Sequence, residues 1–418
     1  MQVPRTSVRP PTRRHDRLRQ AVMDFFCSNS IDHLQGLNPS ATEWCRLLQW
    51  LHVSGLALYF FDRLTSLQLS DRLPPAIHEE LEQAFTDNTL RSRAFLEETL
   101  RLNRAFQDEG VLYANLKGIT LCPFSVPRME LRSQLDLDFL VDPACAERAH
   151  AILERCGYRL HAVSGKSMEF KTPGRSNPRL SDLYKVTPHR SVELHVEPEG
   201  SPRLHRVEWI RREGLSMPSL SPVDHYLSQA LHLFKHIRGE FTRLSWFLEF
   251  RHHTEARKAD SIFWNDFLSL LQDDKKTALG YGIAATTSQE LLDRFVPSHV
   301  SAVTEPLLSM ATRYWITRYS RTALLTDFPG SKLYLLLEEE LTRKEAFAGR
   351  SVQAALLPRR LPPGINCKPE QDSLSAKLYR LRQQVPYVFF RLRFHLVEGA
   401  RYLMASMQWR QFLSGSAQ

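Results

Sequence analysis

Apolar residues in the first quarter of the chain recur at the spacing of one helix face. A series between residues 24 and 108 falls near 3.6-residue intervals, and its clearest members are Trp44, Leu47, Leu48, Leu51, Leu56 and Phe60. A second long series of the same kind occupies residues 75–106. The pattern predicts a helical N-terminal region that ends near residue 108.

The pattern changes to short β-like runs at residue 111. Residues 111–116 predict a strand that ends at Lys117-Gly118, and strict alternation in residues 135–141 predicts another. Asp142-Pro143 then supplies a helix N-cap and a first-turn proline, and Gly157 supplies the C-cap. Further β-like runs occupy residues 158–163, 168–171, 183–186 and 191–196. Together these runs predict a small mixed sheet.

Helical patterns return after residue 198. Ser221-Pro222 begins a helix that reaches about Arg238, and more helices follow to about Gly349. We therefore expect an α+β protein in which a small mixed β-sheet core is embedded between N-terminal and C-terminal helical regions. The expected divisions are a disordered basic tail at 1–20, an N-terminal helical region at 21–108, an α/β core at 109–198, a helical region at 199–350, a linker loop at 351–373 and a basic C-terminal helical segment at 374–418.

The composition is that of an ordinary globular protein. Of the 418 residues, 43% are hydrophobic and 24% are charged. The six cysteines have no Cys-x-x-Cys spacing, so neither a disulfide framework nor a zinc site is indicated, and a reducing cytoplasm fits best. No apolar run approaches the roughly 18 residues that span a bilayer, and the N-terminus lacks the apolar segment of a signal peptide. We expect a cytoplasmic protein without a membrane span.

The net charge of +9 is concentrated near the two ends of the chain. The first twenty residues hold six arginines and one aspartate. The last helical segment carries Lys377, Arg380, Arg382, Arg391, Arg393 and Arg401. Each stretch is either a solvated basic segment or a contact for acidic partners, and the N-terminal tail is also a candidate contact for nucleic acid.

Two aspartates lie one residue apart in the second predicted strand. Alternation places Asp136 and Asp138 on one face, about 6 to 7 Å apart along the strand, with Leu137 and Phe139 on the other. Carboxylates this close repel each other unless a cation lies between them, although the pattern also occurs in solvated edge strands. If residues 191–196 form a neighbouring strand, Glu193 supplies a third carboxylate. Three such carboxylates suit divalent cations that flank an in-line phosphoryl displacement.

Residues beside these strands are candidates for phosphate contacts. Lys117 supplies a positive charge and Gly118 allows the backbone to approach an anion closely. Arg132 lies four residues before Asp136 and could do similar work. Each of the two cations could equally be an exposed loop residue.

The order and spacing of these motifs resemble those of a largely uncharacterised family of bacterial nucleotidyltransferases within the DNA polymerase beta-like superfamily. The matching segments are Leu116-Lys-Gly118, Arg132-x-x-x-Asp136-x-Asp138, Cys156-Gly-Tyr158 and Val192-Glu-Leu-His195. Upstream helices and the downstream segment 243–249 extend the resemblance over about residues 40–350. The resemblance implies that the segment 109–198 is a nucleotidyltransferase core.

The resemblance also implies roles for particular residues. Asp136, Asp138 and Glu193 would be both catalytic residues and ligands of Mg²⁺ or Mn²⁺, while Lys117, Gly118 and Arg132 would bind the nucleotide. The implied reaction moves a nucleoside monophosphate from a nucleoside triphosphate to an acceptor hydroxyl and releases pyrophosphate. The acceptor is left open among small molecules, sugars, proteins and RNA. Lys117-Gly118 stands where the wider superfamily has Gly-Ser, which motivates the alternative of a non-catalytic nucleotide-binding or scaffold protein that retains the fold.

Three histidines share one face of the helix predicted after Ser221. His225, His232 and His236 fall within about 40° of one another, opposite an apolar face. The stripe is interpreted as a solvated or interdomain polar face, as a wall of the catalytic cleft, or, for His232 and His236, as a pair of metal ligands.

Overall fold

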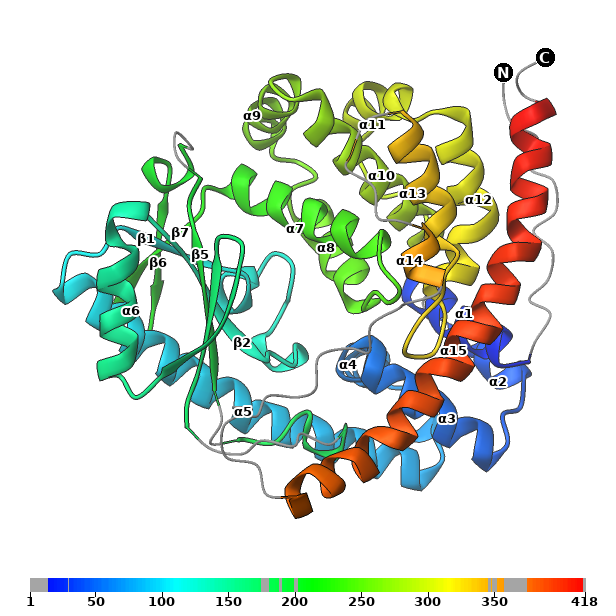
Figure 1. Cartoon of the computed structure of the whole chain (residues 1–418), viewed down its shortest axis with the longest axis horizontal. Coiled ribbons are helices and arrows are strands. Elements are labelled where there is room, and N and C mark those ends of the chain that lie inside the picture. Colours follow the sequence, from blue (N-terminus) through cyan, green and yellow to red (C-terminus); the bar gives the residue numbers. More distant parts are fainter. Residues whose placement is uncertain are drawn as a thin grey trace.

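The computed structural model describes residues 14–28, 30–173, 180–187, 190–198, 202–344, 347, 352–356 and 374–415, with backbone alone for 374–388. A sheet with helices on one side forms one part of the molecule, and a helical bundle forms the other (Figure 1). Residues 1–13 of the tail expected at 1–20, and residues 351 and 357–373 of the linker expected at 351–373, lie outside the described residues.

Helices precede the sheet, as the hydrophobic periodicity predicts. The N-terminal helices are α1 Arg14–Cys27, α2 Asp32–Gly36, α3 Ala41–Ser54, α4 Ala57–Ser66 and α5 Pro75–Asp108. The 34-residue α5 is about 50 Å long and runs from the bundle to beneath the sheet (Figure 1). It therefore connects the two parts of the molecule.

The sheet is mixed and has seven strands in the order β3-β4-β5-β2-β1-β7-β6. The pairs β2–β5 and β1–β7 are parallel and the other pairs are antiparallel. The strands are β1 Tyr113–Leu116, β2 Asp136–Val141, β3 Arg159–Ser164, β4 Ser167–Lys171, β5 Ser191–Val196, β6 Glu208–Arg212 and β7 Leu215–Ser219, with helix α6 Ala146–Arg155 after β2. This arrangement confirms the predicted α+β class.

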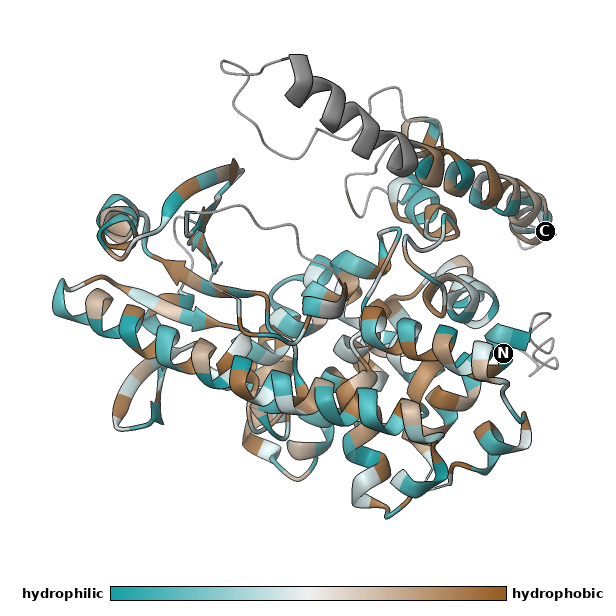
Figure 2. Cartoon of the chain, turned by 90° about the horizontal axis from the view of Figure 1, so that it is seen from below, coloured by the Kyte–Doolittle hydropathy of each residue, from teal (hydrophilic) through white to brown (hydrophobic). Residues whose placement is uncertain are grey.

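The second helical region follows the sheet. Its helices are α7 Pro222–Ile237, α8 Ser245–Ala256, α9 Ser261–Gln272, α10 Lys275–Leu292, α11 Ser298–Thr304, α12 Met310–Leu324, α13 Tyr334–Arg343, α14 Val352–Leu356 and α15 Leu374–Gly415. Ser221 caps α7 and accepts a hydrogen bond from the Asp224 amide, as its sequence pattern predicts. Helix α15 runs along the edge of the molecule in both Figure 1 and Figure 2.

Four expected segments differ from the structure. Residues 352–356 form the short helix α14 inside the segment expected to be a linker loop. Residues 14–20 begin α1 rather than a disordered tail, because Leu18 is buried and the Arg19 guanidinium pairs with Asp327 and the Leu325 carbonyl. Residues 208–219 form the hairpin β6–β7 inside the region expected to be helical. Glu213 and Gly214 both have positive φ at its two-residue turn, which the hydrophobic pattern of the sequence does not reveal. Residues 183–186 are not a strand, because Tyr184 packs against Leu58 and Ala84 of the N-terminal helices.

The strand β2 separates an apolar face from a polar face. Leu137, Phe139 and Val141 point into a core that α5 and α6 cover, together with Val192 and Leu194 of β5. Phe139 packs edge-on against Phe106 and Tyr113, with ring centroids 5.2 and 6.1 Å away. This packing fixes the direction of β2, and the alternate side chains of the strand consequently project from the other face of the sheet.

We expect that replacing Glu98 by Gln lowers the stability of the fold by about 3 kcal/mol at neutral pH. Glu98 of α5 is buried and accepts hydrogen bonds from Arg101 Nε, Tyr158 Oη and Arg190 Nη1 at 2.9, 2.6 and 2.6 Å. Burial alone would raise its pKa, but the hydrogen bonds of Arg101 and Tyr158 and the arginine charges outweigh burial and lower the pKa.

The pH dependence of this effect follows from that direction. Because the pKa of Glu98 is lower in the folded than in the unfolded chain, its contribution is complete above the unfolded pKa and disappears as the pH falls through the folded pKa. Urea unfolding at neutral and acidic pH measures the difference, with exposed Glu97→Gln as the matched control. A destabilisation that is equal at both pH values would contradict this account.

Candidate functional site

Polar side chains of β2 and β5 lie together on the face of the sheet opposite α5 and α6. The parallel register pairs Asp138 with Glu193 and Asp136 with Ser191. Residues in register share a face, and so do residues two apart on one strand. Asp136, Asp138, Glu193 and His195 therefore project from the same side.

Three of these residues form a compact cluster. His195 Nε2 lies 3.1 Å from Asp138 Oδ1 and 3.6 Å from Glu193 Oε2. Ligand atoms of Asp138, Glu193 and His195 all lie within 4.8 Å of one another. Ser167 Oγ is 2.9 Å from His195 Nδ1 and so orients the imidazole from the neighbouring strand β4. Two carboxylates and one imidazole make a donor set that can hold a divalent cation.

Asp136 extends this cluster along β2 without joining it. Burial and the neighbouring charge of Asp138 raise the pKa of Asp136 to about 6, against the opposing charges of Lys117 and Arg132. Burial also disfavours the charged form of Asp138, but the hydrogen bond from His195 and the charge of Lys117 outweigh burial and lower its pKa. The charged form of Asp138 is thus stabilised by its neighbours, whereas the positive charges near Asp136 are too few to stabilise its charged form.

Lys117 and Gly118 are brought to the carboxylates by the turn after β1. Lys117 Nζ lies 3.2 Å from Asp138 Oδ1, where an ammonium already provides a cation. Gly118 has a φ of +53°, and a Cβ there would collide with the Gln134 side-chain amide. Gln134 in turn donates a hydrogen bond of 2.8 Å to the Asp136 carbonyl. The glycine therefore allows the turn to pass close to the start of β2.

Arg132 pairs with a carboxylate that does not belong to the cluster. Its Nε is 3.4 Å from the carboxylate of Glu249 on α8, which is buried and also accepts a hydrogen bond from Tyr59. Its positive charge acts on Asp136, but its described hydrogen bond is to Glu249. Among the six residues expected at the site, Arg132 is thus the one whose side chain is bound elsewhere.

The histidine stripe of α7 faces other parts of the protein. His225 Nε2 lies 3.4 Å from Thr120 Oγ1, three residues after Lys117. The rings of His232 and His236 are 4.5 Å apart, and both contact the Trp246 ring of α8. Burial, followed by the charge of Lys117, lowers the pKa of His232 to about 2. These contacts favour a stripe between α8 and the segment that carries Lys117, rather than a solvated face.

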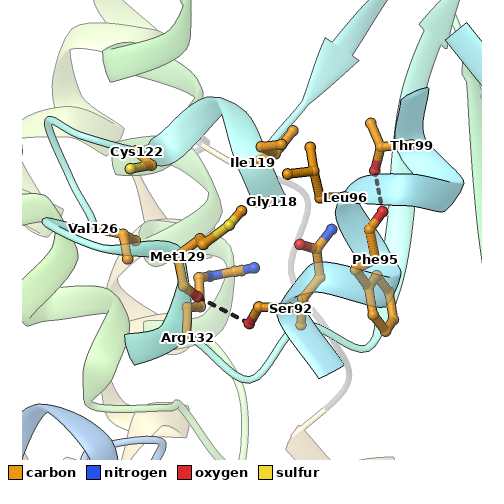
Figure 3. A pocket seen from close by; sticks show the side chains of 11 residues that line it. Ser92, Phe95, Leu96, Thr99, Gly118, Ile119, Cys122, Val126, Met129 and Arg132 are labelled. Atoms are coloured by element: carbon orange, nitrogen blue, oxygen red, sulfur yellow. Dashed lines mark hydrogen bonds between the residues drawn. The ribbon is translucent and has the colours of Figure 1, made fainter. Parts of the chain in front are cut away.

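A small cavity lies behind Gly118 (Figure 3). Side chains from α5 and from residues 118–134 line it, and Ser92 Oγ donates a hydrogen bond to the Met129 carbonyl across one edge. Its volume of about 20 Å³ fits a water molecule rather than a nucleotide. Asp136, Asp138 and Glu193 are not among its lining residues. The cavity is therefore separate from the polar face of β2 and β5.

His195 is the member of the cluster that was not predicted from the sequence to be a ligand. Its position alternates with Glu193 on the polar face of β5, and that alternation was the available signal. Glu197, the next residue in the alternation, is buried and forms a bidentate ion pair with Arg203 instead.

Carboxylates lie on the neighbouring parallel strands β2 and β5 of a mixed sheet, beside the Lys117-Gly118 turn. This arrangement agrees with the class of nucleotidyltransferases that the sequence motifs resemble. The model of a family described as uncharacterised nucleotidyltransferase matches residues 40–287, which is more than half of the chain. The chain belongs to this nucleotidyltransferase family. A search of the curated proteins finds no match.

Proposed function

We propose that this protein is a metal-dependent nucleotidyltransferase that transfers a nucleoside monophosphate from a nucleoside triphosphate to an acceptor hydroxyl. The observation that carries the proposal is the register of β2 and β5, which places Glu193 beside Asp138 on one polar face. Membership of a nucleotidyltransferase family supports the same reaction.

Asp138, Glu193 and His195 would hold one divalent cation, and Asp136 would extend the ligand set along β2. Carboxylate oxygens suit Mg²⁺ or Mn²⁺, and the imidazole is a ligand that transition-metal ions accept more readily than Mg²⁺ does. When bound, such a cation neutralises charge that develops on the phosphoryl oxygens. Lys117 Nζ, now 3.2 Å from Asp138, would then pair with oxygens of the triphosphate.

In the proposed reaction, one bond to the α-phosphorus forms as another breaks, and a group at this site accepts the released proton. The acceptor oxygen forms a bond to the α-phosphorus, and the bond from that phosphorus to the bridging oxygen of the β-phosphate breaks. Pyrophosphate leaves with the bonding electron pair. The proton of the acceptor hydroxyl passes to a carboxylate. Glu193 is suited to this role because its side chain is 32% exposed and can therefore be reached by an acceptor.

The test uses nucleoside triphosphates labelled at the α-phosphate, with Mg²⁺ or Mn²⁺ and a panel of small-molecule, sugar, protein and RNA acceptors. We expect label transfer with equimolar pyrophosphate release, and loss of both when a chelator removes the metal. Undiminished transfer in the presence of the chelator would contradict the metal requirement.

A second function is a nucleotide-binding protein without turnover. The observation that favours it is that Lys117-Gly118 stands where the wider superfamily has Gly-Ser, and that Lys117 pairs with Asp138. Nucleotide binding without pyrophosphate release across the whole acceptor panel would support this second function and exclude the first.

We also propose that the protein acts in the cytoplasm. The five cysteines within the described part of the chain are all free thiols, which supports a reducing compartment. None of the described helices is long and apolar enough to cross a membrane.

A further inference from the structure

Helix α15 is attached to the bundle by one of its faces. Phe394, Tyr402 and Trp409 are buried there. Tyr319 Oη donates a hydrogen bond of 3.3 Å to the Ala405 carbonyl, and the ring of Phe412 stacks at 3.8 Å on Tyr314. These contacts fix which face of α15 points outward.

The outward face of α15 is largely apolar over about five turns. Its large apolar side chains are between 50% and 67% exposed, and they are Phe389, Leu392, Leu396, Val397, Leu403, Met404 and Met407. Figure 2 shows this hydrophobic part of the helix at the edge of the molecule. Scattered exposed leucines are ordinary, but a continuous apolar stripe marks a contact surface.

The stripe is wide. At about 100° per residue, the directions from Leu392 to Val397 enclose an arc of about 140°. A strict coiled-coil seam is narrower, because only two positions of each heptad take part. The width suits a helix that lies in a flat apolar boundary.

From residue 389 on, where the side chains of α15 are described, the charges on the outward side are all positive. Arg393 and Arg410 are exposed within the arc. The single acidic residue of the helix, Glu398, is buried on the opposite side and pairs with Arg401. The whole helix carries seven basic residues, which are Lys377, Arg380, Arg382, Arg391, Arg393, Arg401 and Arg410.

We propose that the outward face of α15 binds the surface of an anionic phospholipid membrane. The apolar stripe enters the boundary between head groups and acyl chains, and the arginines pair with lipid phosphates. The helix lies parallel to the surface and does not cross it.

The charge pattern favours lipid over the other occupants. A second copy of the chain would place Arg393 and Arg410 against an equally basic stripe, and like charges in an interface oppose association. A nucleic acid would leave the seven large apolar side chains without a partner. An anionic lipid surface offers acyl chains to the apolar side chains and phosphates to the arginines.

The test measures flotation of the full chain with vesicles of phosphatidylcholine alone and with roughly 30% phosphatidylglycerol added. We expect binding to the anionic vesicles that is more than tenfold stronger than to the neutral ones. The variant Leu396→Glu/Leu403→Glu should lower the partition coefficient more than tenfold, and Arg393→Ala should lower it about fivefold. Leu396, Leu403 and Arg393 are all exposed, so unchanged melting temperatures are expected.

The matched control is Ile262→Glu, because Ile262 is 73% exposed on α9, away from α15. This control should bind anionic vesicles as the wild type does. The proposal is overturned if the wild type stays unbound with both vesicles, or if Leu396→Glu/Leu403→Glu binds equally well. It is also overturned if the wild type is a dimer that the double variant converts to a monomer, because the stripe is then covered by a second copy.

Discussion

Replacing Asp138 by Asn is expected to reduce nucleotidyl transfer at least about a thousandfold, equivalent to ~4 kcal/mol of transition-state stabilisation. Asp138 is 5% exposed, lies in register with Glu193 and contacts both His195 and Lys117. Asparagine keeps the shape of the side chain but removes its negative charge. The cation would then lose a ligand, and Lys117 and His195 would lose the negative charge that they contact.

Initial rates of label transfer, with melting temperature measured alongside, check this expectation. The matched control is Asp142→Asn, an aspartate directly after the same strand whose side chain caps the next turn by accepting a hydrogen bond from Ala144. That control should keep transfer within about twofold, since surface substitutions away from a site have small effects. A folded Asp138→Asn variant with wild-type activity would contradict the assigned role.

Replacing Phe139 by Ala is expected to lower the free energy of unfolding by about 4 kcal/mol. The Phe139 side chain is 1% exposed and fills the space between Phe106 and Tyr113 under the sheet. Truncation removes buried apolar surface and leaves a cavity that the two neighbouring rings cannot fill. The loss also loosens the strand that carries both aspartates.

Denaturant unfolding measures this effect, with Leu135→Ala as the control. Leu135 lies just before the same strand and is 52% exposed, so its truncation should cost less than about 0.5 kcal/mol. Equal losses in the two variants would show that the apolar face of β2 is not packed as described.

The alternation of side chains made one half of the site predictable. Asp136 and Asp138 lie on one face of β2, and Leu137 and Phe139 lie on the opposite face. This could be predicted because alternation is a local property of a strand. The pairing of Asp138 with Glu193 could be predicted only on the condition that their two strands become neighbours. Register is set by the burial of whole strands and is not coded by either segment alone.

Other parts of the site depend on contacts that are distant in sequence. Arg132 is engaged by Glu249, 117 residues later, so its spacing from Asp136 could not reveal its partner. His195 becomes part of the cluster only because β5 lies beside β2. The hairpin β6–β7 was missed because Glu208 and Trp209 are exposed and give no buried stripe.

Thermal stability with bound nucleotide shows whether the carboxylates of β2 form a nucleotide site, and the measurement requires no knowledge of the acceptor. Wild type and the Asp136→Asn/Asp138→Asn variant are compared with ATP, GTP, CTP and UTP, each with Mg²⁺ or Mn²⁺. A nucleotide at about 100 times its dissociation constant should add roughly 2.7 kcal/mol to the stability of the wild type. We expect a metal-dependent shift in the melting temperature of the wild type that the double variant loses. No shift with any nucleotide, or an equal shift in the double variant, would contradict a nucleotide site built on the carboxylates of β2.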